Sequence, residues 1–235
     1  MRIHRFFIKE NIGNSERLTI KDEAFIHQLK RVFRYEIGDR VVLFDGSGLE
    51  YVASIEMIAR SELVFCIESS KKGLIPKREI SLCFSLVKKD NNDWIIQKAT
   101  ELGVLHIYPI VSERSEKKDL NLERAEKIAI EASEQSGWSV IPIVHPVSDI
   151  QTVLESTKEQ QKIVFDTHTE NLVSQTASVS ISEKNQPIII FIGPEGGWSD
   201  QELALFKASG FTFDTLGLSV LRAETAVVVA LAKFV

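Results

Sequence analysis

The stretch from Ile188 to Ser199 runs from five apolar residues through a glycine-rich turn to a helix start. Its turn, Gly193-Pro194-Glu195-Gly196-Gly197, leaves backbone N–H and C=O groups open to a ligand, because glycine has no Cβ atom. Ligands of open α/β sheets bind beyond the carboxyl ends of the strands. The turn has neither the Gly-Lys-Ser/Thr of a phosphate loop nor the GxGxxG of a dinucleotide site. It therefore predicts a different kind of ligand site, or a plain tight turn.

A second candidate segment, Leu216–Ala226, stands directly before and at the start of the last apolar run. Leu218 and Leu221 are apolar residues outside any periodic element, and Arg222 is a lone cation at the expected helix start. The helix dipole favours acids at that end, so we expect Arg222 to serve a nearby anion or a substrate. Glu224 lies in the first turn of the helix, where it balances the dipole, and we interpret it as structural.

Beyond residue 78, strand-like and helical runs alternate, which predicts an α/β domain with a largely parallel sheet. The expected strands are Glu79–Val87, Val104–Ile110, Lys162–Asp166, Ile188–Ile192 and Phe213–Leu216. The expected helices are Asp93–Leu102, Asn121–Ser136, Ser199–Ser209 and Arg222–Phe234. Ser199-Asp200-Gln201-Glu202 is a capping box that starts the third of these helices. Residues 167–186 are rich in Ser, Thr and Asn and are expected to form a loop, with at most one short helix.

The first part of the chain predicts a small β-barrel. Short β-type runs cover Val41–Phe44, Glu50–Ile55 and Leu63–Ile67, and Asp45-Gly46-Ser47-Gly48 is a hairpin turn between the first two. A helix is predicted over Lys21–Arg34, with Phe25, Leu29 and Val32 on one face. Ser69–Pro76 breaks both patterns and is predicted as a linker, which gives domains at 1–72 and 73–235.

Composition is that of a globular protein, with 44% hydrophobic and 26% charged residues among 235. These values exclude disordered, collagen-like and coiled-coil proteins. No apolar run approaches the roughly 18 residues of a membrane helix, and the N-terminus has no signal-peptide pattern. We therefore expect a cytoplasmic protein. Two cysteines and five scattered histidines give no zinc-ligand spacing, so no metal is expected.

The net charge of −5 hides a division along the chain, with +3 over residues 1–78 and −8 over residues 79–235. Basic residues cluster in the first part, above all Arg5 and the group His27, Lys30, Arg31 and Arg34. One interpretation is a basic face that binds nucleic acid. The other is an ordinary solvated surface.

Taken together, these segments closely resemble the RsmE family of knotted, SPOUT-type methyltransferases, which act on N3 of a uridine in bacterial small-subunit (16S) ribosomal RNA. The resemblance rests first on Gly193–Ser199, Leu216-Gly217 and Leu221–Ala226. Further matching segments are Arg5–Phe7, His27–Val32, Trp94–Val104, Ser112–Ser115 and Glu131–Gly137. The match covers essentially the whole chain, and several motifs in one order are far more specific than any one of them.

The resemblance implies a PUA-like β-barrel followed by an α/β domain with a trefoil knot, and S-adenosyl-L-methionine as the cofactor. It implies a homodimer that acts on small-subunit ribosomal RNA or on the assembled 30S subunit. The implied cofactor contacts are Gly193, Glu195, Gly196, Gly197, Leu216, Leu218 and Leu221. The expected RNA contacts are Arg5, His27, Lys30, Arg31, Arg34 and Arg114.

For the methyl transfer itself, Arg222 and Glu195 are the catalytic candidates. N3 of uridine must lose its proton before it attacks, and a fixed cation stabilises the charge that then spreads over the flanking carbonyl oxygens. Arg222 is the candidate for this cation, and Glu195, or a water that it orients, for the proton acceptor. Glu195 alternatively accepts backbone N–H groups near the following helix. The uridine must be single-stranded or extruded, because base pairing hides N3.

One position departs from the family pattern: Trp138 stands where the family usually has a basic residue. Its ring would either stack on a base or pack at the dimer interface. Two other functions remain open at this point. One is a non-catalytic RNA-binding ribosome-assembly factor with a vestigial cofactor pocket, and the other is a knotted methyltransferase that acts on a different RNA nucleotide.

Overall fold

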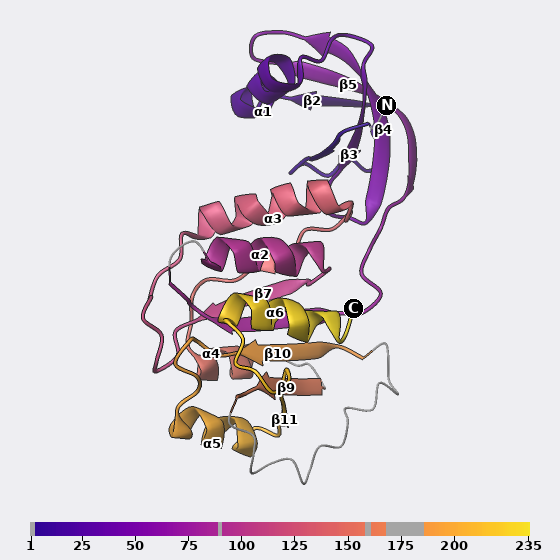
Figure 1. Cartoon of the computed structure of the whole chain (residues 1–235). Helices are drawn as coiled ribbons and strands as arrows, with labels where there is room; N and C mark the ends of the chain where they lie inside the picture. Colours follow the sequence, from indigo (N-terminus) through magenta and orange to yellow (C-terminus); the bar gives the residue numbers. More distant parts are fainter. Residues whose placement is uncertain (1–2, 89–90, 158–160, 168–185) are drawn as a thin grey trace. The chain divides into compact units, whose positions relative to one another are not determined.

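The computed structural model describes residues 3–88, 91–157, 161–167 and 186–235, which form two compact units (Figure 1). The N-terminal unit contains Met1–Ile75 and Ser133–Val140, and the C-terminal unit contains Pro76–Ala132 and Ile141–Val235. The segment Ser133–Val140 joins the N-terminal unit through backbone pairing, because Ser139 N–H donates to Leu74 C=O and Gly48 N–H donates to Ser139 C=O. No run of residues in the sequence indicates this association.

The N-terminal unit is built on a five-stranded sheet with the strand order β1-β3-β4-β5-β2. β1 is parallel to β3, and the other neighbouring strands are antiparallel. The strands are β1 Arg5–Phe7, β2 Arg17–Ile20, β3 Arg40–Phe44, β4 Leu49–Ile58 and β5 Leu63–Lys72. The three predicted strands and their hairpin turn are confirmed. β1 and β2 are too short to show a period and were not predicted as strands.

β5 continues through four residues that the sequence predicted as linker. Ser69, Ser70, Lys71 and Lys72 pair with residues 49–52 of β4. Their side chains are exposed, so the apolar alternation that identifies a strand is missing although the backbone ladder continues. The prediction of a linker from Ser69 is therefore wrong up to Lys72.

The predicted helix over residues 21–34 is two elements rather than one. α1 covers Glu23–His27 and is capped by the Asp22 carboxylate, and a π-helix, η1, covers Gln28–Phe33. A π-helix bonds i to i+5 and so turns each residue through a smaller angle than an α-helix does. Val32, which α-helical spacing placed on the buried face, is consequently 67% exposed, and Phe33 packs on the core in its place.

The C-terminal unit contains a six-stranded parallel sheet with the order β11-β9-β10-β6-β7-β8. The strands are β6 Ile80–Ser85, β7 His106–Ile110, β8 Ile143–Val144, β9 Gln161–Phe165, β10 Ile188–Ile192 and β11 Thr212–Asp214. The helices are α2 Asn91–Glu101, α3 Leu122–Ser136, α4 Ile150–Ser156, α5 Asp200–Ala208 and α6 Ala223–Ala232. The predicted α/β class and parallel sheet are confirmed.

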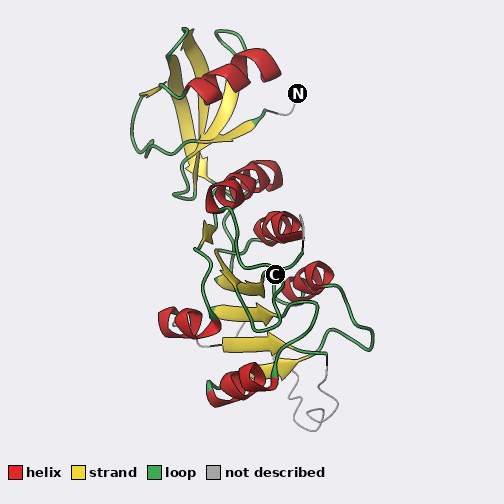
Figure 2. Ribbon diagram, turned by 90° about the vertical axis from the view of Figure 1, so that its left-hand side faces the viewer, coloured by secondary structure: helices red, strands yellow, loops and turns green. Residues whose placement is uncertain are grey.

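Helices cover both faces of this sheet (Figure 2). Ile188, Ile190 and Ile192 of β10 pack in one cluster with α2, α3 and α6. Ile189 and Phe191 face the other way and pack with α4 and α5. β10 is therefore apolar at every position, because no face of the sheet is left to water.

The sequence did not predict β8 and α4. β8 has two residues, fewer than any periodicity can show, and prolines at 142 and 146 stand on either side of it. α4 has seven residues and begins where the Asp149 carboxylate accepts a hydrogen bond from Thr152 N–H. The loop predicted over residues 167–186 falls almost entirely outside the described residues.

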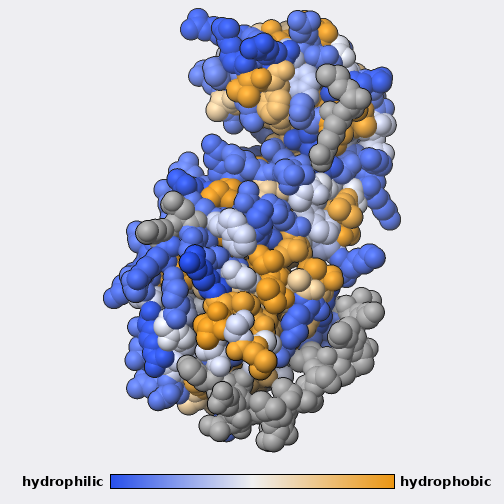
Figure 3. Space-filling model, in the orientation of Figure 1, coloured by the Kyte–Doolittle hydropathy of each residue, from blue (hydrophilic) through white to orange (hydrophobic). Residues whose placement is uncertain are grey.

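α6 is apolar on nearly all sides. Val227, Ala230 and Leu231 are buried against the sheet, whereas Val229 is 37% exposed. The preceding loop exposes two further apolar residues, Leu218 and Val220. Figure 3 shows apolar side chains gathered on the surface over α6. Among the described residues, no helix combines the length and the apolar character needed to cross a membrane.

Candidate active site

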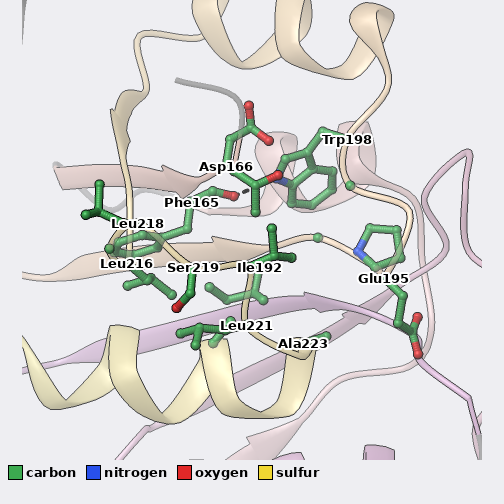
Figure 4. A pocket seen from close by; sticks show the side chains of 17 residues that line it. Phe165, Asp166, Ile192, Glu195, Trp198, Leu216, Leu218, Ser219, Leu221 and Ala223 are labelled. Carbon is green, nitrogen blue, oxygen red and sulfur yellow. Dashed lines mark hydrogen bonds between the residues drawn. The ribbon is translucent and has the colours of Figure 1, made fainter. Parts of the chain in front are cut away.

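Three loops meet at the carboxyl edge of the parallel sheet. They follow β9, β10 and β11, which are neighbours in the sheet order. Because parallel strands end at the same edge, residues far apart in sequence come together there. The result is one pocket, formed by Phe165–Thr167, Ile192–Glu195, Gly197-Trp198, Leu216–Leu221, Ala223 and Ala226 (Figure 4). Both segments that the sequence singled out, the glycine turn and the Leu216–Leu221 loop, line it.

Trp198 holds the glycine turn against the end of β9. Its Nε1 donates a hydrogen bond to the Phe165 carbonyl at 3.0 Å, and its ring packs on Gly193. A Cβ atom at Gly193 would lie 3.0 Å from the Trp198 ring, so the ring leaves no room for a side chain there. Gly197 has φ +68°, a conformation that side-chain-bearing residues rarely adopt. Two of the glycines are thus explained by packing and by backbone conformation.

The turn ends in the capping box that the sequence predicted. The Ser199 hydroxyl accepts from Glu202 N–H, and the Glu202 carboxylate accepts from Ser199 N–H at 2.8 Å. The same carboxylate accepts from Glu113 N–H at 2.8 Å. The start of α5 is therefore tied both to the glycine turn and to the loop after β7.

Gly196 differs from its neighbours because it does not line the pocket. Its carbonyl accepts a hydrogen bond from Arg114 Nη1 at 2.9 Å, and an added Cβ would face the Arg114 side chain. Arg114 was expected to contact RNA. The structure places it against the glycine turn, with its side chain exposed.

The two catalytic candidates lie at the edge of the pocket. Glu195 belongs to the lining, but its carboxylate points away from the other side chains there and accepts from Lys88 N–H at 3.4 Å (Figure 4). Arg222 is exposed at the N-cap of α6, between Leu221 and Ala223, which both line the pocket. Its side chain makes no capping hydrogen bond.

Several lining residues, chiefly Phe165 and Asp166, were not predicted from the sequence as part of a site. Lys162–Asp166 was predicted only as a strand, yet the end of a strand beside the glycine turn in a parallel sheet is itself a signal for a site. Trp198 was noted as part of the motif, but its packing on Gly193 and its bond to β9 are tertiary contacts.

Known proteins share this architecture and much of the sequence. Residues 75–235 match a family model described as an RNA methyltransferase domain, and residues 26–68 match an RNA methyltransferase PUA domain. Ribosomal RNA small subunit methyltransferase E of Rickettsia conorii is 30% identical over 234 residues, covering 99% of this chain and 95% of the relative. The Aquifex aeolicus protein of the same name is 32% identical, covering 96% of each chain. The chain belongs to the ribosomal RNA small subunit methyltransferase E family.

Solved structures agree with the family assignment. The methyltransferase E of Neisseria gonorrhoeae, bound to S-adenosyl methionine, has a TM-score of 0.85 at 28% identity and covers 99% of this chain and 96% of its own. A putative methyltransferase from Legionella pneumophila with bound S-adenosyl methionine also has a TM-score of 0.85, at 27% identity, with 100% and 97% covered. The resemblance and the two-part fold stated from the sequence are confirmed.

The pocket residues fit the cofactor of the methyltransferase E family. Phe165, Ile192, Trp198 and Leu216 supply apolar walls of the kind that hold an adenine ring. At Gly197 and Gly217 an added Cβ would meet no atom within 4 Å, so the backbone itself borders open space there. A nucleoside can therefore approach backbone N–H and C=O groups without meeting a side chain.

In the N-terminal unit of this methyltransferase E family member, Arg5 has a structural position. Its guanidinium pairs with the Glu50 carboxylate, and Nη2 donates to the Trp138 carbonyl at 3.1 Å. The side chains of Arg5 and Glu50 are only 15% and 7% exposed. Ser139 Oγ donates to Glu50 at 2.9 Å, and Lys71 Nζ lies 3.3 Å from it. We name Arg5, Glu50, Lys71 and Ser139 the Glu50 cluster.

The Glu50 cluster controls the ionisation of its carboxylate. Burial alone would raise the pKa of Glu50, but hydrogen bonds from Arg5 and Ser139 and the charge of Arg5 hold that pKa below its usual value. The cluster also fixes the backbone at Trp138, whose side chain is half-buried.

The other basic residues expected to contact RNA differ in exposure. His27, Arg31 and Arg34 are exposed on α1, η1 and the residue that ends η1. Arg34 has φ +57°, a left-handed conformation that is uncommon for a residue with a side chain and that clusters at functional sites. Lys30 is half-buried, and its Nζ donates to the Ala59 carbonyl at 2.6 Å.

Proposed function

We propose that this protein uses S-adenosyl-L-methionine to methylate N3 of a uridine in bacterial small-subunit (16S) ribosomal RNA. The observation that carries this proposal is the pocket at the carboxyl edge of the sheet, in a chain that aligns along nearly all of its length with methyltransferase E proteins. When bound, the cofactor supplies a methyl group on a positively charged sulfur. The chain's residues must bind it, leave that methyl group accessible, and prepare N3 for attack.

Arg222 is the proposed electrostatic catalyst. Leu221 and Ala223 line the pocket, so the intervening guanidinium starts at its margin, and its exposed side chain is free to reach a base that docks there. As N3 loses its proton, negative charge spreads over the two neighbouring carbonyl oxygens of the uracil. A planar guanidinium carries both a positive charge and several N–H donors, so it can stabilise this charge and bond to the oxygens.

Glu195 is the proposed proton acceptor, directly or through a water molecule that it orients. It lies on the pocket lining, and its carboxylate points away from the other lining side chains (Figure 4). Cofactor contacts are proposed for Gly193, Glu195, Gly197, Leu216, Leu218 and Leu221, which all line the pocket. Gly196 does not line it, and its proposed role is to hold the turn through the hydrogen bond from Arg114 to its carbonyl.

RNA binding is proposed for His27, Arg31 and Arg34 on the N-terminal unit, with Lys30 and with Arg114 beside the glycine turn. The exposed guanidinium groups of Arg31 and Arg34 are able to neutralise phosphates. Arg5 is assigned to the Glu50 cluster instead, because its guanidinium is already paired.

The active form is proposed to be a homodimer in the cytoplasm, acting on small-subunit ribosomal RNA, either free or in the assembled 30S subunit. Leu218 and Val220 in the loop before α6, and Val229 within α6, expose apolar side chains. Figure 3 shows apolar surface over α6, which a second copy would cover. The trefoil knot of SPOUT enzymes is part of the proposal. Its support is that the chain passes from β11 at the sheet edge back to α6, which packs on β10.

A transfer assay tests the proposal. The purified protein is incubated with S-adenosyl-L-methionine labelled in its methyl group and with either 30S subunits or free small-subunit RNA from cells that lack this activity. We expect label in the RNA, released on digestion as N3-methyluridine, and the substrate that gives more label identifies the form on which the enzyme acts. Binding of RNA without any transfer to either substrate would instead identify a non-catalytic assembly factor.

A further inference from the structure

The pocket has a one-sided charge distribution. Among the described residues that line it, Asp166 and Glu195 carry charge, and no lysine, arginine or histidine does. A pocket with carboxylates and no cation favours a ligand with positive charge.

Glu195 is the less suitable of the two. It is exposed, and its carboxylate accepts a hydrogen bond from Lys88 N–H at 3.4 Å. Asp166 is half-buried, and its carboxylate has no hydrogen bond or ion pair with any residue in the described part of the chain. Asp166 therefore offers the pocket an unpaired negative charge.

Asp166 is also held firmly at its backbone. Its N–H donates to the Asp214 carbonyl of β11 at 3.2 Å. The carbonyl of the preceding residue, Phe165, accepts the Trp198 indole N–H at 3.0 Å. The backbone at Asp166 is thus fastened to β11 on one side and to the glycine turn on the other, which fixes the point from which its side chain starts.

We propose that Asp166 is the cation-recognising residue of the cofactor pocket, and that its carboxylate pairs with positive charge on the methyl donor. This inference rests on the proposed function. The donor carries two cationic groups, the sulfonium and the amino-acid ammonium, and either would satisfy the carboxylate. Apolar walls alone would hold the adenine part but would not distinguish a charged donor from an uncharged nucleoside thioether.

Binding measurements with three ligands test the proposal. S-Adenosyl-L-methionine has both cationic groups, S-adenosylhomocysteine has the ammonium alone, and 5′-methylthioadenosine has neither. Titration calorimetry on the full chain compares the wild type with Asp166→Asn, which keeps the shape of the side chain and removes its charge. Asp119→Asn, at an exposed carboxylate outside the pocket, is the matched control.

We expect Asp166→Asn to lower the affinity for S-adenosyl-L-methionine about tenfold, which is the scale of one partly solvated charge pair. The affinity for 5′-methylthioadenosine should stay unchanged. The loss should shrink as salt is added. If S-adenosylhomocysteine keeps its affinity, the partner is the sulfonium, and if it weakens in parallel, the partner is the ammonium. Either result supports the proposal.

Two results would overturn the proposal. An equal loss of affinity for 5′-methylthioadenosine would show that Asp166 contacts the nucleoside part of the ligand. An unchanged affinity for S-adenosyl-L-methionine would show that Asp166 does not contribute to binding of the methyl donor. Should Asp166→Asn fold poorly, Asp166→Ser provides the same comparison. Failure of the wild type to bind any of the three ligands would count against the proposed function itself, so the two failures are distinguishable.

Discussion

Replacing Arg5 with methionine should destabilise the N-terminal unit without weakening RNA binding by the folded protein. Arg5 and Glu50 are 15% and 7% exposed, so the substitution leaves a carboxylate in the interior without its main partner. Breaking a buried pair in this way costs about 3–5 kcal/mol. Lys71 and Ser139 remain near Glu50, so we expect about 3 kcal/mol, at the low end of that range. Folding free energies total about 5–15 kcal/mol, so such a loss is large.

The measurement is equilibrium unfolding of the full chain in urea, followed by fluorine NMR of fluorotryptophan. The chain has three tryptophans, and Trp138 belongs to the N-terminal unit, whereas Trp94 and Trp198 belong to the C-terminal unit. The Trp138 signal should shift its midpoint to lower urea. The double variant Arg5→Met, Glu50→Leu should recover much of the loss, because it removes both charges together.

Two outcomes would refute this reasoning. An Arg5→Met variant within about 0.5 kcal/mol of the wild type, the usual range for an exposed surface position, would show that the pair is not buried in solution. A variant of unchanged stability with clearly weaker RNA binding would return Arg5 to the RNA-contacting residues that the sequence predicted.

The Glu50 cluster also predicts a pH dependence. The pKa of Glu50 is lowered in the folded protein, so its stabilising effect is present above the unfolded pKa, near 4.3, and is lost as pH falls through the folded value. The difference in unfolding free energy between wild type and Glu50→Gln should therefore be full at pH 6–7 and should shrink below about pH 4. A difference that stays constant down to pH 3 would contradict the assignment.

Three further predictions concern the site. Arg222→Ala should lower kcat and kcat/KM together by about 100-fold to 1,000-fold, with the cofactor affinity nearly unchanged. If steady-state kinetics show only a raised KM for RNA, Arg222 binds the RNA and does not stabilise the transition state. Gly193→Ala should lower the affinity for the cofactor, because the new Cβ would lie 3.0 Å from the Trp198 ring and displace that ring. Wild-type affinity in calorimetry would contradict this. Arg31→Ala and Arg34→Ala should each reduce the salt slope of RNA binding by about 1 or somewhat less, and an unchanged slope would mean that these cations are only solvated.

Most of the architecture of the C-terminal unit could be predicted from the sequence, because the patterns that indicate its strands and helices are local. The apolar run Ile188–Ile192 and the capping box at Ser199 each depend on neighbours in the chain, and both were located correctly. The η1 segment was not, since α-helical and π-helical spacing differ by too little over six residues to separate in a sequence. Val32 was misplaced for this reason.

The candidate site was predictable only in part. The glycine turn and the Leu216–Leu221 loop were visible as motifs, and the resemblance to a known family supplied the cofactor. Asp166 and the Glu50 cluster were not visible. Asp166 lies beside the glycine turn because of the sheet order β11-β9-β10. Arg5 is paired with Glu50, which is 45 positions away in the sequence. Such contacts are tertiary, and no local pattern encodes them.

The central claim is that this protein methylates N3 of a uridine in small-subunit ribosomal RNA. Its most direct test is mass-spectrometric mapping of that RNA from cells with the gene, without it, and with an Arg222→Ala copy in its place. We predict one N3-methyluridine that is present in the first cells, absent in the second, and strongly reduced in the third. An identical modification pattern in all three cell lines, or the loss of a methyl group from a different nucleotide, would contradict the claim.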